Sequence, residues 1–116
     1  MNRDNKFTID NNQIVELKDL LDEDFKNFIA VYFNDFEAKS EEMSIAIENN
    51  NLDNVNKLAH ALKGNSLSVG ALGLANICKQ LEIVTKSGDY KATVREYQGL
   101  QKIYPKFKEE FLRIAA

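Results

Sequence analysis

The sequence is poor in the residues that several common classes of protein require. One cysteine in 116 residues excludes an internal disulfide, and the chain has one proline, one histidine and no tryptophan. No apolar run approaches the roughly 18 residues of a membrane-spanning helix, and no positively charged start leads into a hydrophobic segment. These features predict a protein of a reducing compartment, the cytoplasm, without direct membrane contact.

An excess of positive charge is also missing. The 15 Lys and Arg residues are outnumbered by 18 Asp and Glu residues, which gives a net charge of -3. Nucleic-acid-binding domains usually carry a basic surface, so we expect no nucleic-acid partner. A length of 116 residues, 44% of them hydrophobic, suits one domain whose single core needs neither disulfides nor metal ions.

What the chain does contain is helical periodicity along nearly its whole length. We predict an all-α fold, an up-and-down antiparallel four-helix bundle with a short additional N-terminal helix. Residues 1-12 are polar and are expected to form a flexible segment, and residues 13-116 are expected to form the single bundle domain. The apolar and aromatic side chains of the second helix are expected in the core: Phe25, Phe28, Ile29, Tyr32, Phe33 and Phe36.

Turn and capping residues predict where the helices begin and end. Asp22 is the expected N-cap of the long second helix. Residues 49-51 are expected to form a tight connection to a third helix over about residues 52-69, which Gly70 ends.

The last two helices are predicted in the same way. Gly88 is expected to end the fourth helix, and Asp89 is expected to cap the start of the fifth. Pro105 is expected to kink or split that fifth helix near Gln101.

The single histidine, His60, lies on the predicted third helix and points away from its apolar side. With about 100° per residue, several residues fall within roughly 60° of His60 on a helical wheel. They are Asp53, Asn56, Lys57, Lys63, Gly64 and Leu67. The apolar residues of the helix fall on the opposite side, so we expect an exposed imidazole. A buried core histidine, the more common explanation, fits this pattern less well.

Two neighbours of His60 suggest its chemistry. Lys63 lies one turn further on the same face, where its ammonium group could neutralise an anion attached to the imidazole. Gly64 costs the helix up to about 1 kcal/mol relative to alanine, which suggests that a side chain there would obstruct a docking protein. Each residue alone has an ordinary explanation as solvated surface, but the three together are less ordinary.

One stretch of the sequence resembles the histidine-containing phosphotransfer (HPt) domain family. It begins with His60 in the run HALKGNSLSVGA and continues through Leu74, Cys78, Leu81 and Glu82. The family signature is a histidine, then Leu-Lys-Gly, then a second glycine followed by a helix that ends in Leu-Glu, and the spacing agrees across about 25 residues. The family is a helical bundle of about this length, so the resemblance extends to almost the whole chain.

The resemblance implies a role for four residues. His60 is the phosphoacceptor, Lys63 and Gly64 lie beside it, and Glu82 accepts a hydrogen bond from the imidazole. A carboxylate bonded to the Nδ1–H group would fix the tautomer and leave the Nε2 lone pair facing outward. Glu82 has an alternative, a surface pair with Lys86 four residues further on.

The same resemblance implies the partners. The chain has no Gly-rich phosphate loop, no kinase Lys-Glu pairing and no Asp cluster typical of a Mg²⁺ site, so we expect a phosphocarrier rather than an enzyme, with no ATP site or cofactor of its own. A response-regulator receiver domain would bring the phosphoaspartate and the Mg²⁺ ion, and a sensor kinase would lie upstream. The chain is expected to be a monomer, and the sequence leaves open whether it stands alone or belongs to a hybrid sensor kinase.

Three residues form the candidate docking patch around His60: Asn56, Lys57 and Leu67. Two alternatives to phosphate transfer are considered. A helical module that binds a receiver without carrying phosphate is disfavoured because His60, Lys63 and Gly64 are all intact. A metal site built from His60 and Cys78 offers too few ligands on different faces, and Cys78 is expected in the core.

Overall fold

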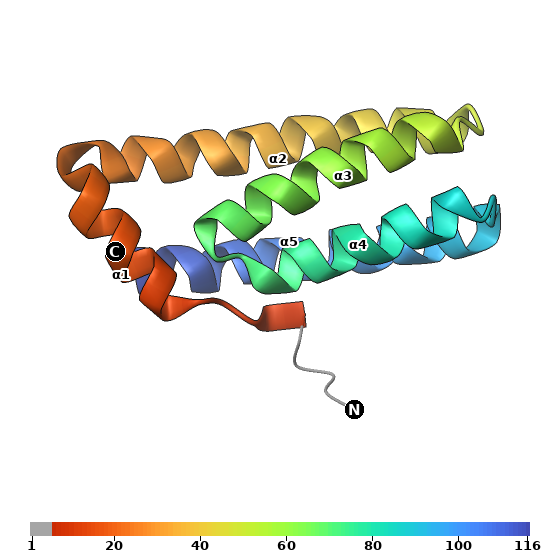
Figure 1. Ribbon diagram of the computed structural model, residues 1–116. Helices are drawn as coiled ribbons and strands as arrows, with labels where there is room; N and C mark the ends of the chain where they lie inside the picture. The colour runs from red at the N-terminus through yellow and green to blue at the C-terminus, as the bar shows by residue number, and fades with distance from the viewer. Residues whose placement is uncertain (1–5) are drawn as a thin grey trace.

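The helices of the computed structural model, which describes residues 6–116, form an elongated bundle (Figure 1). Its four long helices run up and down in antiparallel order: α2 (Phe25–Glu48), α3 (Leu52–Val69), α4 (Leu72–Lys86) and α5 (Tyr90–Ala115). The shorter α1 (Asn11–Leu21) crosses one end of the bundle. Residues 6–116 contain no strand. The predicted all-α four-helix bundle with a short N-terminal helix is confirmed.

The α3 and α4 helices pack closely because both bury small side chains. Ala59 on α3 and Ala75 and Cys78 on α4 are all buried. Short side chains at a contact let two helix axes approach each other, and the backbones of α3 and α4 share the most extensive contact of any helix pair. A polar side chain on either helix can therefore reach the backbone or the side chains of the other.

The α2 and α5 helices are held apart by aromatic rings. The rings of Phe33 and Phe111 meet edge to face at 5.3 Å, and those of Phe36 and Tyr104 stack at 5.2 Å. Such pairs add about 0.5–1.5 kcal/mol each beyond the burial of their area. Phe28 is an exception among the aromatic residues of α2. It is 38% exposed, so the prediction that it lies in the core is wrong: its position on α2 faces outward.

Most of the predicted helix ends are confirmed. The side chain of Asn51 accepts a hydrogen bond from the Asn54 backbone N–H at 3.1 Å, and that of Asp89 accepts one from Ala92 at 3.0 Å. Gly70 and Gly88 end their helices in the left-handed conformation that glycine adopts without strain, with φ of 83° and 73°.

One prediction about a helix end is wrong, and of the kink or split expected at Pro105 the split is absent. Asp22 does not cap α2; it ends α1, with its backbone N–H bonded to the Lys18 carbonyl, and starts a 3-10 turn (Asp22–Asp24) before α2 begins. The three consecutive acidic residues made the capping position ambiguous. Pro105 does not split α5, which continues through it. Burial of Ile103 and Phe107 on either side outweighs the roughly 3 kcal/mol that a proline costs in a helix interior.

The segment before α1 binds the turn between α3 and α4. The Asp10 backbone N–H donates to the Gly70 carbonyl at 2.9 Å, and Gly73 donates to the Thr8 carbonyl at 2.8 Å. A Cβ on Gly70 would lie only 3.1 Å from the Asp10 carbonyl oxygen, so this close approach also requires glycine. Of the predicted flexible segment 1-12, residues 1–5 lie outside the described residues, and α1 already begins at residue 11.

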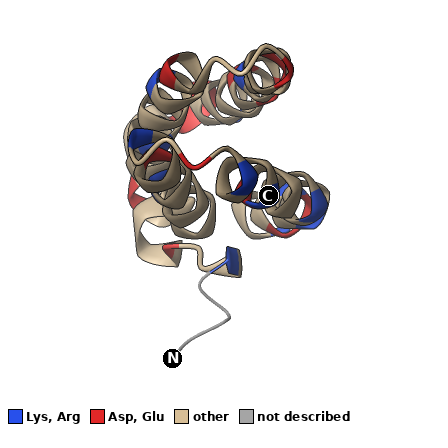
Figure 2. Cartoon of the chain, turned by 90° about the vertical axis from the view of Figure 1, so that its right-hand side faces the viewer, with Lys and Arg blue, Asp and Glu red and all other residues tan. Residues whose placement is uncertain are grey.

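Acidic and basic residues occur on the same helices, as Figure 2 shows in a view along the bundle. The helices therefore carry charges of both signs. In the part of the chain that the structure describes, no helix combines the length and the apolar character needed to cross a membrane.

Candidate functional site

The His60 side chain stands out from the middle of α3. It is 71% exposed, which confirms the prediction of an outward-pointing imidazole. The opposite face of α3 is buried in the core through Val55, Leu58, Leu62 and Val69. Because that apolar face fixes the rotation of the helix, the ring has no route into the core and remains open to an approaching molecule.

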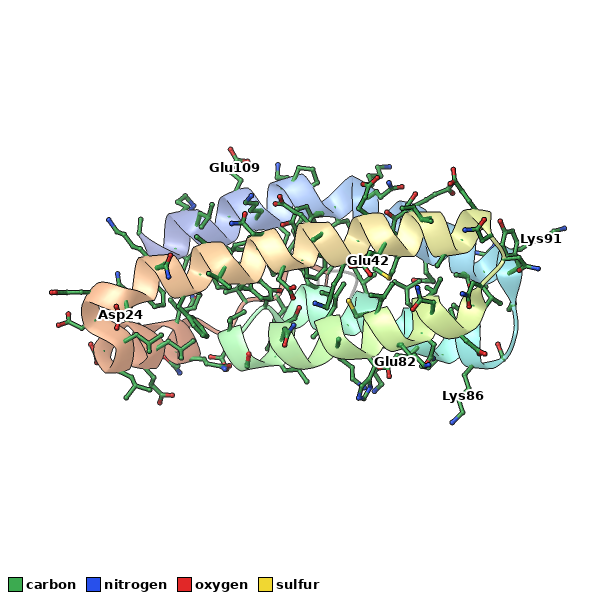
Figure 3. The ribbon with its side chains drawn as sticks, turned by 90° about the horizontal axis from the view of Figure 1, so that it is seen from above. Asp24, Glu42, Glu82, Lys86, Lys91 and Glu109 are labelled. Atoms are coloured by element: carbon green, nitrogen blue, oxygen red, sulfur yellow. The ribbon has the colours of Figure 1, made fainter. Side chains whose placement is uncertain are left out.

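Glu82 on α4 holds the imidazole in place. Its Oε2 atom lies 2.7 Å from His60 Nδ1, so the hydrogen bond that the resemblance implies is present. Glu82 lies where α3 and α4 run side by side (Figure 3), and its side chain is 19% exposed. Partial burial tends to raise the pKa of this carboxyl, but the hydrogen bonds and charge of Lys63 and His60 outweigh burial and lower the pKa below its ordinary value.

The ionised carboxylate determines which ring nitrogen carries the proton. A carboxylate can only accept hydrogen bonds, so Nδ1 must be the donor. In the neutral ring Nε2 is then the unprotonated nitrogen, and it has no hydrogen-bond partner within residues 6–116. The structure thus has a nucleophilic lone pair that faces solvent.

Lys63 binds the second oxygen of the same carboxylate. The Lys63 Nζ atom lies 2.7 Å from Oε1 of Glu82, and this oxygen is buried. The Lys63 side chain itself is 29% exposed. Two residues one turn apart on α3 therefore share one carboxylate. The alternative pairing of Glu82 with Lys86 is not found among the ion pairs of the described chain.

Gly64 leaves a bare stretch of α3 beside His60. It is exposed, and a Cβ built on it would have no heavy atom within 4 Å. Internal packing therefore gives no reason for glycine at this position. The helix loses stability here without any compensation inside the domain, which favours a reason outside it.

The three candidate docking residues differ in their surroundings. Leu67 is 48% exposed and Lys57 is exposed, as a docking role requires. Asn56 instead turns toward α4, where its Nδ2 atom lies 3.0 Å from the Glu82 carbonyl oxygen and 3.0 Å from Thr85 Oγ1. Thr85 was not among the residues predicted from the sequence, where its only signal is its position one turn after Glu82 on α4.

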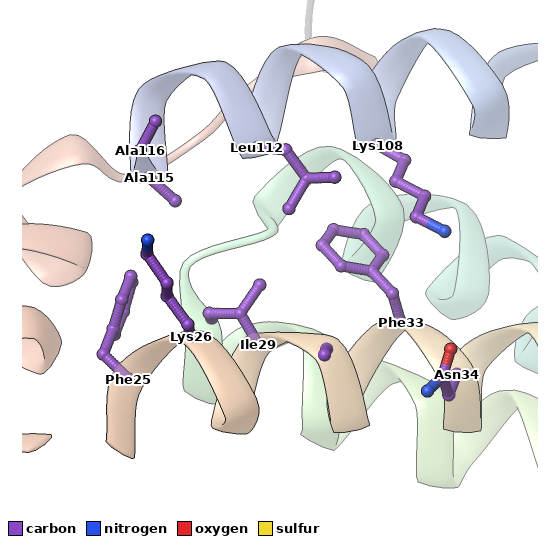
Figure 4. A pocket seen from close by; sticks show the side chains of 10 residues that line it. Phe25, Lys26, Ile29, Phe33, Asn34, Lys108, Leu112, Ala115 and Ala116 are labelled. Carbon is purple, nitrogen blue, oxygen red and sulfur yellow. The ribbon is translucent and has the colours of Figure 1, made fainter. Parts of the chain in front are cut away.

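A separate apolar groove of about 350 Å³ lies between α2 and α5 (Figure 4). Its lining includes Phe25, Ile29, Phe33 and Leu112, with Lys26 from α2 and Lys108 from α5. Lys108 is already paired with Glu37 at 2.7 Å. The groove contains none of the residues around His60, so it belongs to a different part of the surface.

Cys78 offers no chemistry at this site. It is fully buried, and burial raises the pKa of its thiol to about 12, so it stays protonated. Residues 6–116 contain no group of three or more His, Cys, Asp or Glu side chains placed to hold a metal ion. A buried thiol and an exposed imidazole do not form a common site.

Comparisons with known proteins agree with this geometry. The model of the Hpt domain family matches residues 27–111. Among solved structures, the chain is similar to histidine-containing phosphotransfer protein B (HptB) from Pseudomonas aeruginosa PAO1, with a TM-score of 0.86 and 19% identity over 91% of this chain and 92% of that one. It is also similar to histidine-containing phosphotransfer protein MtHPt2 from Medicago truncatula, with a TM-score of 0.82 and 28% identity over 94% and 78%. No curated protein matches the chain.

Proposed function

Because this chain belongs to the Hpt domain family, we propose that it is a phosphocarrier that accepts a phosphoryl group on His60 and passes it on. The donor is the phosphoaspartate of a receiver domain or an upstream sensor kinase, and the acceptor is the receiver domain of a response regulator. The observation that carries this proposal is the exposed imidazole whose Nδ1 is bonded to Glu82 and whose Nε2 is free. The carrier acts as a cytoplasmic monomer.

The transfer step needs little from this chain beyond position. The Nε2 lone pair attacks phosphorus in line, the bond between phosphorus and the aspartate oxygen breaks, and the aspartate carboxylate leaves with that electron pair. The ring becomes a cation that still carries its proton on Nδ1, and the Glu82 carboxylate 2.7 Å away stabilises it. No general base is needed, because Nε2 carries no proton to remove. The receiver supplies the Mg²⁺ ion.

Lys63 supports the phosphorylated state. Its ammonium group already lies beside His60 through their shared carboxylate, and its long flexible side chain can turn toward a phosphoryl group on Nε2. Lys63 would exchange the Glu82 carboxylate for the phosphoryl group, so its positive charge is paired with an anion both before and after transfer.

The surface that surrounds His60 is the proposed receiver-docking surface. On α3 it contains Lys57, Gly64 and Leu67. The hydrogen bond of 2.6 Å between Tyr32 and Ser66 places α2 beside this part of α3, and two neighbours of Tyr32, Phe28 and Val31, are exposed at 38% and 57%. Exposed apolar side chains thus flank the contact on both helices, a pattern typical of protein interaction surfaces.

The test of the proposed function is phosphate transfer itself. The protein is incubated with receiver domains of its source organism that have been phosphorylated with a small-molecule phosphodonor. We expect an acid-labile, alkali-stable phosphate on His60 and a corresponding loss of phosphate from the receiver. Receiver binding with no transfer would instead support a module that binds receivers without carrying phosphate.

Leu67→Asp tests the docking surface. A charge at the centre of an apolar contact should weaken receiver binding roughly tenfold or more, the cost of losing an interface anchor. Because Leu67 is half exposed, the helix content by circular dichroism should stay unchanged. Binding is measured by titration calorimetry. Ile45→Asp is the matched control, since Ile45 on α2 is similarly exposed at 53% but lies outside this surface. Equal affinities for the two variants would remove Leu67 from the interface.

A further inference from the structure

The Asn56 side chain makes two hydrogen bonds to α4 at the residue that binds His60. Its Nδ2 group donates to two acceptors, the Glu82 carbonyl oxygen and Thr85 Oγ1, each at 3.0 Å. Thr85 is 6% exposed, and its hydroxyl donates to the Leu81 carbonyl at 2.7 Å, so its oxygen is free to accept from Asn56. The Asn56 amide therefore binds α4 inside the domain instead of facing a partner.

Three residues of α3 together hold the single residue Glu82. Asn56 binds its backbone carbonyl, His60 binds Oε2 and Lys63 binds Oε1. They lie at intervals of four and three residues, so they follow one another along the same face of the helix. Within α4 the Glu82 carbonyl also accepts from Thr85 Oγ1 at 3.1 Å, so the Asn56 contact adds a direct tie from α3 to a backbone that α4 itself already holds.

We infer that Asn56 is a positioning residue for the proposed phosphotransfer. It fixes the backbone of Glu82 against α3, and Glu82 in turn keeps the proton of the neutral His60 ring on Nδ1 and the lone pair on Nε2. The expected effect of Asn56 on the rate of phosphate transfer rests on the proposed function. Its effect on the His60 tautomer does not, because that effect is present in the unphosphorylated protein. A misplacement of about 1 Å in a reacting group can cost up to about 100-fold in rate, so this anchor has a measurable effect.

The first experiment measures the tautomer of His60 in the unphosphorylated protein. Ring ¹⁵N chemical shifts are recorded by NMR at a pH where the imidazole is neutral. Asn56→Ala should move the ring population from the Nδ1–H toward the Nε2–H tautomer, in the same direction as Glu82→Ala. Thr85→Val, which removes one of the two amide acceptors and keeps the side-chain shape, should give a smaller shift in that direction. A wild-type tautomer in both Asn56→Ala and Thr85→Val would overturn the inference.

Tyr32→Phe is the matched control for a loss of stability alone. It also removes a buried hydrogen bond between two helices, of 2.6 Å to Ser66, but this bond joins α2 to α3 and does not involve Glu82. The control should lower the melting temperature and keep the wild-type tautomer. A tautomer shift in Tyr32→Phe equal to that in Asn56→Ala would reduce Asn56 to a general structural role and so refute the inference.

The second experiment measures transfer from a phosphorylated receiver. Asn56→Ala should slow transfer roughly tenfold, within the range expected for a slightly misplaced group. In the Glu82→Ala background the same substitution should cause no further loss, because Asn56 acts through Glu82. Multiplied losses in the double variant would contradict this. If the wild-type protein takes no phosphate at all, the proposed function fails, while the tautomer experiment still decides the role of Asn56.

Discussion

His60→Gln is expected to abolish phosphorylation and to leave the bundle folded. Glutamine has similar polarity and reach, but the lone pair of its amide nitrogen is delocalised into the carbonyl and cannot attack phosphorus. The wild-type side chain is 71% exposed, so its replacement should change the free energy of unfolding by only about 0.5 kcal/mol. Phosphate incorporation is measured with a radiolabelled, phosphorylated receiver.

The control for this variant is the replacement of a charged surface residue by glutamine at a position away from His60. Lys102 is exposed on α5, so Lys102→Gln should accept phosphate at the wild-type rate. Thermal unfolding of all three proteins, followed by circular dichroism, should give melting temperatures within a few degrees of one another. Phosphate bound to a folded His60→Gln protein would place the acceptor on another residue and reject the assignment.

The direction of the His60 side chain follows from the sequence because it depends on one helix alone. The apolar residues Val55, Leu58 and Leu62 fix which side of α3 faces the core, and the helical period then determines the opposite side. No knowledge of the other helices is needed. This is why the exposure of both His60 and Leu67 was predicted correctly.

The identity of the neighbouring helix does not follow from one helix alone. On the wheel, Asn56 and Lys63 fall on one side of His60, while Lys57 and Gly64 fall on the other. The structure places α4 beside the first pair, so both are partly covered, while the second pair is exposed. Which side a following helix covers depends on the geometry of the whole bundle, so an amide that anchors α4 looked the same in the sequence as a docking residue.

Local propensity also fails where tertiary packing opposes it. Asp22 is a good N-cap by composition, yet it ends α1 with φ of 50°, and Pro105 lies inside a continuous helix. Beside Pro105 the helix is held by side chains that contact distant parts of the chain, such as the stack of Phe36 on Tyr104. Single-residue preferences of about 1–3 kcal/mol do not decide the outcome against such contacts.

Substitution of Gly64 should raise stability and lower transfer at the same time. Gly64→Ala removes the conformational freedom of an exposed helical glycine, which should stabilise the protein by up to about 1 kcal/mol and raise its melting temperature by a few degrees. The added Cβ has no neighbour within 4 Å, so it causes no clash inside the domain. The same atom stands on the surface that the receiver must approach, and we expect slower transfer.

A side chain larger than alanine at position 64 should slow phosphate transfer further without a further change in stability. Gly64→Gln keeps the gain in helix stability, since glutamine is also a good helix former. Its side chain extends over the helix surface beside His60 and holds the phosphoaspartate away from Nε2. Transfer should fall roughly 100-fold, the scale of loss expected when reacting groups are separated by about 1 Å more than the reaction allows.

Gly99 provides the matched control, because it is a second helical glycine whose added Cβ would meet nothing within 4 Å. It lies on α5, a helix that contributes no residue to the site. Gly99→Gln should gain similar stability and transfer phosphate at the wild-type rate. A Gly64 variant that is more stable but transfers phosphate more slowly cannot owe its slower transfer to unfolding. Wild-type transfer by Gly99→Gln would show that the slower transfer depends on where the new side chain lies. Wild-type transfer by Gly64→Gln would mean that the receiver approaches His60 from another direction.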